Sequence, residues 1–467
     1  MTDAVTDAVT DAPAPADLVV AGADLVVLCD DAGRELPGGW VAITGGTVTG
    51  VGTGPPPPAV ETLDATGCLV TPGLVNTHHH LYQNLTRSHG PAIRGGLFAW
   101  LTTLYPLWAG LDEEASYLAA RVGLAELALG GCTTTTDHLY VAPAGGGDLW
   151  AAEILAAREA GMRFHPTRGS MTRSVDDGGL PPRSVVQDDD AVLADSERLV
   201  AAHHDPSPGS MCRVALAPCS PFSVSPELMT RTAELAERLD VRLHTHLAED
   251  ADEDAYCLET FGRRPVEHFE EVGWLGDRSW VAHCLFPSDD EIARLGAAGT
   301  GVAHCPSSNA VLGNARICPV PDLRAAGAPV GLGCDGSASN DAASLWLEAR
   351  QALLVGRLRA GPAAMSARDV LTLATRDGAR CLGRAGEIGQ LTVGAAADLV
   401  VWPRTGLAYA GALTDPVEAW LRCGPTAARD TVVAGRFVVR DSRPVATDLD
   451  DVLVRHRRAA ERIQGVG

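Results

Sequence analysis

Two kinds of hydrophobic pattern divide the chain. Near both ends, at 18–70 and again at 386–441, short β-branched runs are punctuated by Gly, Asp and Pro. Such runs predict short strands joined by tight turns. Because the two ends share this texture, they predict one small β-sandwich built from residues 17–70 and 386–467, the second part ending in a C-terminal helix. The middle of the chain is inserted between the two parts, which leaves both termini on one module.

The middle, at 71–385, alternates short apolar runs with helical stretches rich in Ala and Leu. Eight runs read as strands: 74–80, 132–138, 163–169, 213–219, 242–249, 280–284, 301–305 and 330–336. Eight strand–helix repeats in roughly 300 residues match the size of a (β/α)8 barrel. The predicted fold is therefore of the α/β class, a TIM-like barrel with an attached β-sandwich.

The first residues and the cysteines bear on location. Residues 1–16, with a TDAV repeat followed by APAPA, predict a disordered leader that is too polar to pack. The leader has no apolar segment typical of a signal peptide, and no run in the chain approaches the length of a membrane span. Twelve cysteines lie singly, with no CxxC pair. This scatter is typical of reduced thiols in a cytoplasmic protein.

The charge narrows the choice of partners. The 467 residues include 37 basic and 59 acidic ones, for a net charge of −22. Such a chain repels phosphate backbones and anionic lipids, so we expect neither nucleic acid nor membrane as a partner. Every basic residue is Arg. The absence of lysine excludes a P-loop lysine, a Schiff base and a carboxylated lysine bridging two metals.

Five candidate metal ligands stand where predicted barrel strands end. His78 and His80 lie two residues apart, so strand alternation turns both toward the same face. His246, His283 and Asp335 end the fifth, sixth and eighth strands. A single strand-end histidine is often only structural, but the carboxyl ends of barrel strands share one rim. Imidazoles with a carboxylate suit Zn²⁺ or Fe²⁺, so one divalent metal is predicted.

Four motifs together resemble the amidohydrolase superfamily: TPGLVNTHHHLYQ (71–83), LHTHLAE (243–249), VAHC (281–284) and GLGCDGSASND (331–341). The segment GQLTVGAAADLVVW (389–402) resembles the terminal β-sandwich of that superfamily, so the resemblance spans nearly the whole chain. It implies a single metal held by His78, His80, His246 and Asp335. His283 is then expected beside the water and the substrate. The lack of lysine agrees, because the binuclear branch usually needs a carboxylated one.

The resemblance also implies catalytic roles. A metal ion lowers the pKa of water that it binds, and Asp335 is the expected base. Glu249 lies three residues after His246, and in the deaminase branch such a glutamate carries a proton to a ring nitrogen. His283 is expected to orient the water. The alternative for Glu249 is a solvated loop carboxylate that begins the acidic run at 249–254.

Within the superfamily the chain looks closest to the deaminase and s-triazine hydrolase group, and more narrowly to the 8-oxoguanine deaminases. This implies hydrolysis of 8-oxoguanine to urate and ammonia. Alternatives are guanine, isocytosine, S-adenosylhomocysteine or methylthioadenosine, and s-triazines. A noncatalytic barrel is a further alternative, but such proteins typically lose a ligand and here each expected ligand position is filled. The resemblance also suggests a homo-oligomer, either a dimer or a larger assembly.

The candidate substrate contacts are less specific. Gln83, three residues past the second metal histidine, is expected to contact a substrate carbonyl, since an amide both donates and accepts. Its alternative is a cap bonded to the backbone. Tyr105 and Trp108, with Trp100, follow at roughly helical spacing and could wall a flat ring. Their alternative is core packing.

Three further positions follow other strands. Arg168 ends the third strand and could bind a carbonyl or anionic oxygen, while His138 and Tyr140 follow the second strand and are pocket candidates. The loop at 304–309, after the seventh strand, resembles a family loop that shapes the pocket floor. It could equally be a turn with a capping asparagine.

Overall fold

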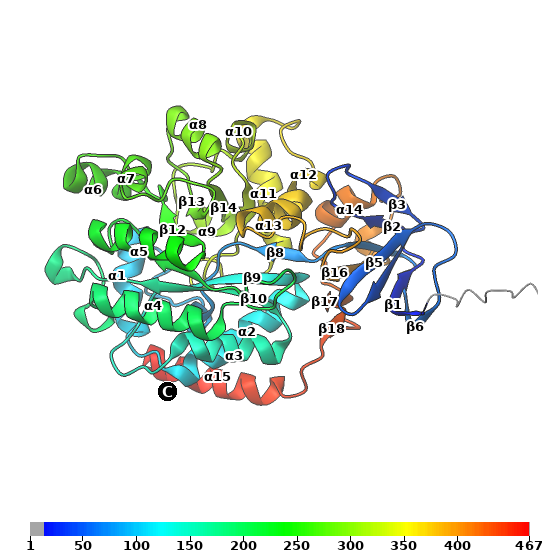
Figure 1. The fold of residues 1–467 in the computed structure, drawn as a ribbon, viewed down its shortest axis with the longest axis horizontal. Coiled ribbons are helices and arrows are strands. Elements are labelled where there is room, and N and C mark those ends of the chain that lie inside the picture. Colours follow the sequence, from blue (N-terminus) through cyan, green and yellow to red (C-terminus); the bar gives the residue numbers. More distant parts are fainter. Residues whose placement is uncertain (1–13, 467) are drawn as a thin grey trace, which may run out of the picture.

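A closed barrel of eight parallel strands forms the larger part of the molecule (Figure 1). The computed structural model describes residues 14–466. Around the barrel the strand order is β10-β11-β12-β13-β14-β15-β8-β9. The strands are β8 (Leu74–Asn76), β9 (Cys132–Leu139), β10 (Arg163–Ser170), β11 (Ala215–Pro218), β12 (Leu243–Leu247), β13 (Ser279–His283), β14 (Gly301–His304) and β15 (Val330–Leu332). The predicted fold class is confirmed.

Helices surround the barrel, and polar caps start several of them. Asp112 accepts a hydrogen bond from the Ala115 amide at the start of α2, and Ser288 forms a capping box with Glu291 at α8. The helices of the barrel region are α1 (Leu97–Trp108), α2 (Glu113–Leu129), α3 (Leu149–Ala160), α4 (Asp189–His203), α5 (Pro226–Leu239), α6 (Ala251–Phe261), α7 (Pro265–Glu271), α8 (Asp289–Ala298), α9 (Pro306–Val311), α10 (Val320–Ala326), α11 (Leu345–Ala360), α12 (Ala367–Thr372) and α13 (Gly378–Cys381), with the short helical segments η1 (Leu81–Thr86), η2 (Val175–Asp177), η3 (Arg183–Val185) and η4 (Leu373–Asp377).

Two sheets built from the chain ends form the smaller module. A four-stranded sheet has the order β5-β4-β1-β6, and a seven-stranded sheet has the order β19-β18-β17-β16-β7-β2-β3. The bounds are β1 (Ala16–Ala21), β2 (Leu25–Val27), β3 (Glu35–Pro37), β4 (Trp40–Thr44), β5 (Thr47–Gly52), β6 (Ala59–Asp64), β7 (Cys68–Pro72), β16 (Leu399–Pro403), β17 (Asp430–Val433), β18 (Arg436–Arg440) and β19 (Arg443–Pro444), with η5 (Leu407–Tyr409) and α14 (Pro416–Arg422) between β16 and β17. Antiparallel pairing of β7 with β16 joins the two ends, as predicted.

The C-terminal helix α15 (Leu449–Gln464) packs on the barrel, against α2 and η1, rather than on the sandwich to which the sequence assigned it. Figure 1 shows it beneath α2 and α3. Gln464 Nε2 donates to the Leu85 carbonyl at 2.7 Å, and His456 Nε2 lies 2.8 Å from Asn84 Oδ1. The end of the chain therefore supports η1, the segment that follows His80.

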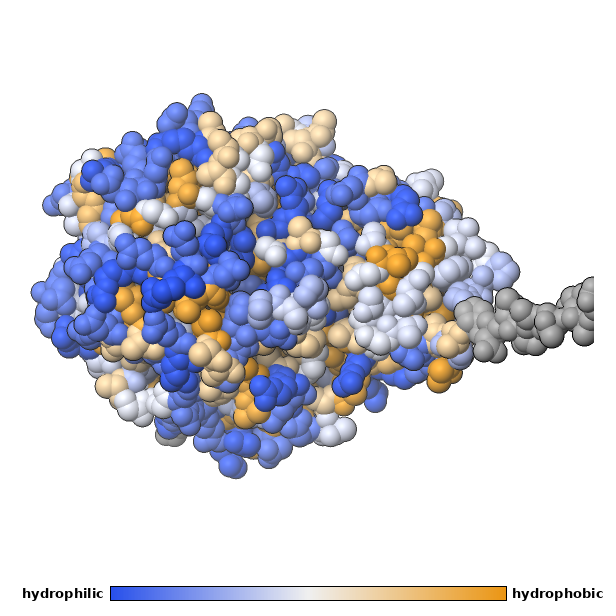
Figure 2. All heavy atoms as spheres, in the orientation of Figure 1, coloured by the Kyte–Doolittle hydropathy of each residue, from blue (hydrophilic) through white to orange (hydrophobic). Residues whose placement is uncertain are grey.

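The face of the molecule shown in Figure 2 is largely polar. Hydrophilic residues cover most of the face in Figure 2, and apolar residues appear there in small groups. Among the described helices, none is both long and apolar enough to cross a membrane. The leader predicted for 1–16 lies mostly outside the described residues, and β1 already begins at Ala16.

A buried ion pair ties the barrel to the sandwich. Arg163 at the start of β10 donates from Nε and Nη2 to both oxygens of Asp398, each at 2.9 Å, and both side chains are almost fully buried. Arg163 also donates to the Gly209 and Ser210 carbonyls, at 2.5 and 2.8 Å. This pairing satisfies the charges that both modules bury at their junction.

We predict that Arg163→Ala lowers the free energy of unfolding by about 3–5 kcal/mol, because Asp398 then stays buried without its cation. Urea unfolding of the full chain measures the change. Arg158→Ala is the matched control, since Arg158 is an exposed arginine on α3. Equal, small losses in the two variants would show that the buried pair does not stabilise the junction.

Candidate functional site

Three histidines and an aspartate meet at the carboxyl ends of the barrel strands. His80 Nε2 lies 3.2 Å from His246 Nε2 and 3.2 Å from Asp335 Oδ1, and His78 Nε2 lies 3.4 Å from Asp335 Oδ1. The strand β8 ends earlier than predicted, at Asn76. The ladder nevertheless continues, because the Asp335 amide donates to the His78 carbonyl at 3.0 Å. His78 and His80 therefore still face the barrel mouth together.

Backbone carbonyls fix the orientation of two of these rings. His80 Nδ1 lies 2.6 Å from the His138 carbonyl, and His246 Nδ1 lies 2.6 Å from the Cys219 carbonyl. A carbonyl only accepts, so each Nδ1 carries the proton and donates it. The Nε2 atom of each neutral ring then presents a lone pair to the cluster.

A further histidine, His244, fixes the orientation of the His78 ring. His244 Nδ1 donates to the Trp280 carbonyl at 2.9 Å, so its Nε2 accepts from His78 Nδ1 at 2.8 Å. Burial lowers the pKa of His244 to about 3, which keeps it neutral and able to accept. His78 Nε2 is buried and has no hydrogen-bond partner. The sequence analysis missed His244, although it lies two residues before His246 on the same strand face.

The donor atoms fit a divalent cation. Bonds of about 2.0–2.1 Å in a tetrahedral site place neighbouring ligands about 3.3 Å apart. The observed separations of 3.2–3.4 Å match this spacing. The charge also fits: the Asp335 carboxylate is buried, and the lone pairs of His78 Nε2 and His80 Nε2 point toward it with no proton between them. A buried carboxylate among neutral imidazoles needs a cation.

Left-handed backbone conformations gather at this site. His283, Cys284 and Asp335 have φ angles of 73°, 49° and 59°, and Ala248 has a φ of 52°. Non-glycine residues rarely adopt this region, and such conformations concentrate at functional sites. Hydrogen bonds hold the turn at Asp335, where Oδ1 accepts from the Gly336 amide at 2.7 Å. These turns aim side chains from the strand ends into the barrel mouth.

Glu249 and His283 stand beside the cluster. Glu249 is only 4% exposed, and its Oε1 lies 3.5 Å from His283 Nε2. Burial raises the pKa of Glu249 well above its usual range, and the charges of Asp335 and Asp250 raise it further. His283 Nδ1 donates to Asn309 Oδ1 at 2.8 Å, which leaves Nε2 directed toward the cluster. Asn309 lies in helix α9 (Pro306–Val311), where a loop or a turn was expected from the sequence, and its pairing with His283 was not foreseen.

A small pocket lies over these groups, and α1 supplies part of its wall. Its lining combines histidines, carboxylates and other polar groups with apolar side chains: His80, Gln83, Leu97, Trp100, Leu101, Tyr105, Tyr140, Cys219, Phe222, His246, Glu249, His283, Leu312, Asp335 and Ser339. Gln83 is 1% exposed and its Oε1 is buried without a hydrogen-bond partner. A Cβ at Gly336 would lie 1.9 Å from that oxygen, so only glycine permits this approach.

Arg168 lies away from the pocket. Alternation along β10 turns it to the outer face of the barrel. There it donates to Asp195 Oδ2 at 2.8 Å and to Gln187 Oε1 at 2.9 Å, and its guanidinium stacks 4.1 Å from the Trp150 ring centroid. Its donors serve the packing between barrel and helices rather than a bound ring.

Trp108 and His138 are also absent from the pocket lining. Trp108 is buried in the core and donates to Thr86 Oγ1 at 3.1 Å. His138 Nε2 donates to the Ala217 carbonyl at 2.9 Å, and its ring stacks on His246 at 4.7 Å between centroids. His138 thus packs against the His246 ring, and one of its ring nitrogens lies within 4.8 Å of nitrogens of His78, His80 and His246.

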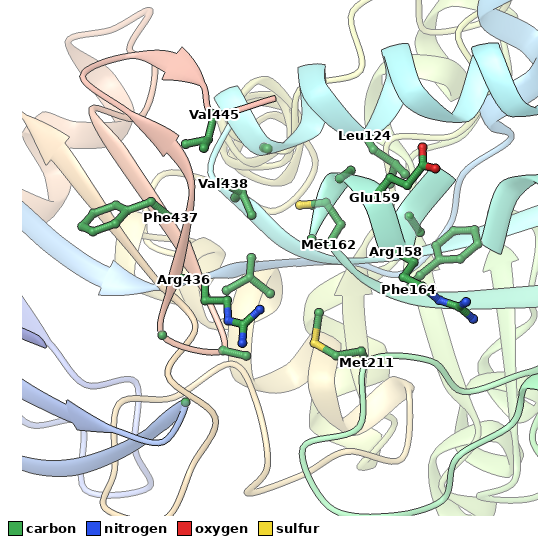
Figure 3. Close-up of a pocket in the computed structure, with 18 of the residues that line it drawn as sticks. Leu124, Arg158, Glu159, Met162, Phe164, Met211, Arg436, Phe437, Val438 and Val445 are labelled. Atoms are coloured by element: carbon green, nitrogen blue, oxygen red, sulfur yellow. The ribbon is translucent and has the colours of Figure 1, made fainter. Parts of the chain in front are cut away.

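A larger cavity lies elsewhere. A cleft of about 1580 Å³ separates the barrel from the β18 region, and Met162, Met211, Arg158 and Arg436 are among the residues that line it (Figure 3). Its described lining contains no histidine. Volume alone therefore does not mark the reactive site, and the smaller pocket over the histidines is the candidate active site.

Comparisons with known proteins agree with this geometry. The profile of the amidohydrolase family matches residues 69–435. The chain is 48% identical over 433 residues to an 8-oxoguanine deaminase of Pseudomonas aeruginosa, which covers 92% of this chain and 96% of that protein. It is 38% identical to an isoxanthopterin deaminase from an unknown prokaryotic organism, covering 93% of each chain. The crystal structure of an atrazine chlorohydrolase from Arthrobacter aurescens complexed with zinc is similar with a TM-score of 0.90, at 33% identity over 95% of this chain and all of that one.

We predict that His244→Ala weakens metal binding about 10–100-fold, because His78 then loses the acceptor that fixes its tautomer. Competition with a chelator, followed by elemental analysis, measures the change. His203→Ala at the end of α4 is the control. Metal affinity as high in His244→Ala as in the control would contradict the orienting role.

Proposed function

Because this chain belongs to the amidohydrolase family, we propose that it hydrolyses the exocyclic amine of a planar heterocycle, with 8-oxoguanine as substrate and urate and ammonia as products. The observation that carries this proposal is the buried Glu249, whose Oε1 lies 3.5 Å from His283 Nε2 at the edge of the cluster and whose pKa is raised by burial. When water attacks a ring carbon, a neighbouring ring nitrogen must gain a proton, and a protonated acid beside the proposed metal site can supply it.

We propose that His78, His80, His246 and Asp335 hold one divalent metal. When bound there, such an ion lowers the pKa of water and so supplies a nucleophile near neutral pH. Imidazole and carboxylate ligands suit both zinc and iron. The similar chlorohydrolase structure with zinc supports Zn²⁺ as the ion, with Fe²⁺ as the alternative.

The proton steps belong to side chains of this chain. Asp335 accepts a proton from the attacking water at Oδ2, the oxygen that lies 3.9 Å from His283 Nε2. His283, anchored by Asn309, orients that water through Nε2. Glu249 gives its proton to a ring nitrogen as the tetrahedral carbon forms. Asp335 then gives its proton to the departing amine, which leaves as ammonia, and the hydroxyl proton of the tetrahedral carbon passes to Glu249 as the carbonyl forms.

Two residues of the pocket are proposed to hold the ring. Gln83 carries an unsatisfied amide oxygen, so a ring N–H can donate to it while its NH₂ group donates to a carbonyl. This pattern fits a lactam edge. Tyr105, which also lines the pocket, offers an aromatic face to a planar ring. The apolar remainder of the wall favours a free base over the nucleoside alternatives, whose sugar hydroxyls would need partners.

The proposed location and assembly rest on less specific features. We propose that the protein works in the cytoplasm, because all twelve cysteines are unpaired and ten of them are buried. We also propose that the protein forms a homo-oligomer, either a dimer or a larger assembly. Light scattering of the purified protein would measure its mass.

We predict that, in a screen of ammonia release, 8-oxoguanine gives a higher kcat/KM than the alternatives. The panel contains guanine, isocytosine, isoxanthopterin, S-adenosylhomocysteine, methylthioadenosine and an aminated s-triazine. The product from 8-oxoguanine is expected to absorb as urate. A higher kcat/KM for another ring would overturn the choice of substrate and leave the reaction class intact.

We predict that Glu249→Gln lowers kcat by about 10²–10⁴-fold while the metal content holds, because the amide is isosteric but gives up no proton. Steady-state kinetics with parallel elemental analysis measures both quantities. Glu270→Gln, at an exposed position on α7, is the control. Full activity of Glu249→Gln would remove the proton transfer from the mechanism.

A further inference from the structure

Glu253 holds the backbone that carries Glu249. It is the third residue of α6 and is fully buried. Its Oε1 accepts from the Ala248 amide at 3.0 Å, and its Oε2 accepts from the Glu249 amide at 2.8 Å. One carboxylate therefore binds two consecutive N–H groups of the turn between β12 and α6.

That turn is conformationally demanding. Ala248 has a φ of 52°, in the left-handed region that an L-residue rarely occupies. Its carbonyl accepts from the amides of Leu285 and Phe286, at 2.8 and 3.1 Å. Such a conformation persists only where surrounding bonds over-determine it. Glu253 supplies the bonds on the amide side of the turn.

Helix capping does not explain Glu253. In a capping box the third helical residue bonds to the amide of the N-cap residue itself. Here the N-cap is Asp250, which accepts from the Asp252 amide at 2.9 Å and so caps α6 without help. Glu253 instead reaches outside the helix to residues 248 and 249. Its buried carboxylate is thus committed to the turn rather than to the helix.

We propose that Glu253 is a positioning residue for the reaction: it sets the direction in which Glu249 leaves the backbone, so that the Glu249 carboxyl faces His283 and the ring. This inference rests on the proposed role of Glu249. The carbonyl of Glu249 is held as well, since Asn314 Nδ2 donates to it at 3.3 Å. Both the amide and the carbonyl of Glu249 are therefore hydrogen-bonded, which fixes the position of its Cα and the direction of its side chain.

The two hydrogen bonds to the turn require a carboxylate at position 253. Two parallel N–H donors need two acceptor oxygens, which an ionised carboxylate offers. A glutamine of the same shape would turn its NH₂ group toward one of the amides. That amide would lose its acceptor, and the left-handed turn would lose one of its two bonds to residue 253. A displacement of the acid by about 1 Å can cost 10²-fold in rate.

A double-mutant cycle on the metal-loaded enzyme tests the proposal. Glu253→Gln is expected to lower kcat about 10–100-fold, with KM and metal content unchanged. In a Glu249→Gln background the same substitution is expected to have no further effect on kcat, because Glu253 acts only through Glu249. Glu259→Gln, an exposed change on the same helix, is the control and should leave kcat unaltered.

The outcomes separate this inference from the function proposed above. An equal loss in both backgrounds, a loss of metal, or unchanged kcat in Glu253→Gln overturns the positioning role and leaves the function standing. A fully active Glu249→Gln overturns both. If Glu253→Gln does not fold, Glu253→Asp carries the test, because it keeps the charge but is one methylene too short to reach both amides. Unchanged kcat in Glu253→Asp then overturns the proposal.

Discussion

The convergence of three Nε2 atoms and one carboxylate oxygen at the barrel mouth is the constraint on which the rest of the site depends. Each imidazole is held through its other nitrogen: His80 and His246 by backbone carbonyls, and His78 by His244. His138 and Cys219 lie on the strand next to the ring that each holds or in the turn after it, and His244 on β12 reaches His78 from across the barrel, so closing the barrel orients all three rings. The proposed metal site is in this sense a property of the strand register, and the buried ion pair of Arg163 with Asp398 joins the attached sandwich to the same barrel.

Two carboxylates in one pocket are held in opposite protonation states. The Asp335 carboxylate lies among the Nε2 atoms that would hold a cation, and a cation favours its ionised form, whereas burial and the charges of Asp335 and Asp250 raise the pKa of Glu249. An ionised base and a protonated acid can therefore coexist at one pH. Separating two titratable groups in this way is how a single pocket assigns the roles of acid and base. The geometry needs no lysine, and the chain has none.

The sequence was most informative where periodicity decides the outcome. Eight apolar runs predicted eight strands, and alternation predicted that His78 and His80 share a face, because both follow from local geometry. Arg168 shows the limit: its strand was predicted, but which face of the barrel it takes depends on the register of the closed sheet. His244, Asn309 and Glu253 could not be assigned from sequence, since their partners come from turns and neighbouring strands whose approach is set by tertiary packing.

The most direct measurement of the central claim is a crystal structure of the metal-loaded protein, with anomalous scattering recorded at the metal edge. We expect one ion per chain, bound at about 2.0–2.2 Å by the Nε2 atoms of His78, His80 and His246 and by an oxygen of Asp335. Two ions bridged in the barrel mouth, or an ion whose protein ligands do not include Asp335, would contradict it.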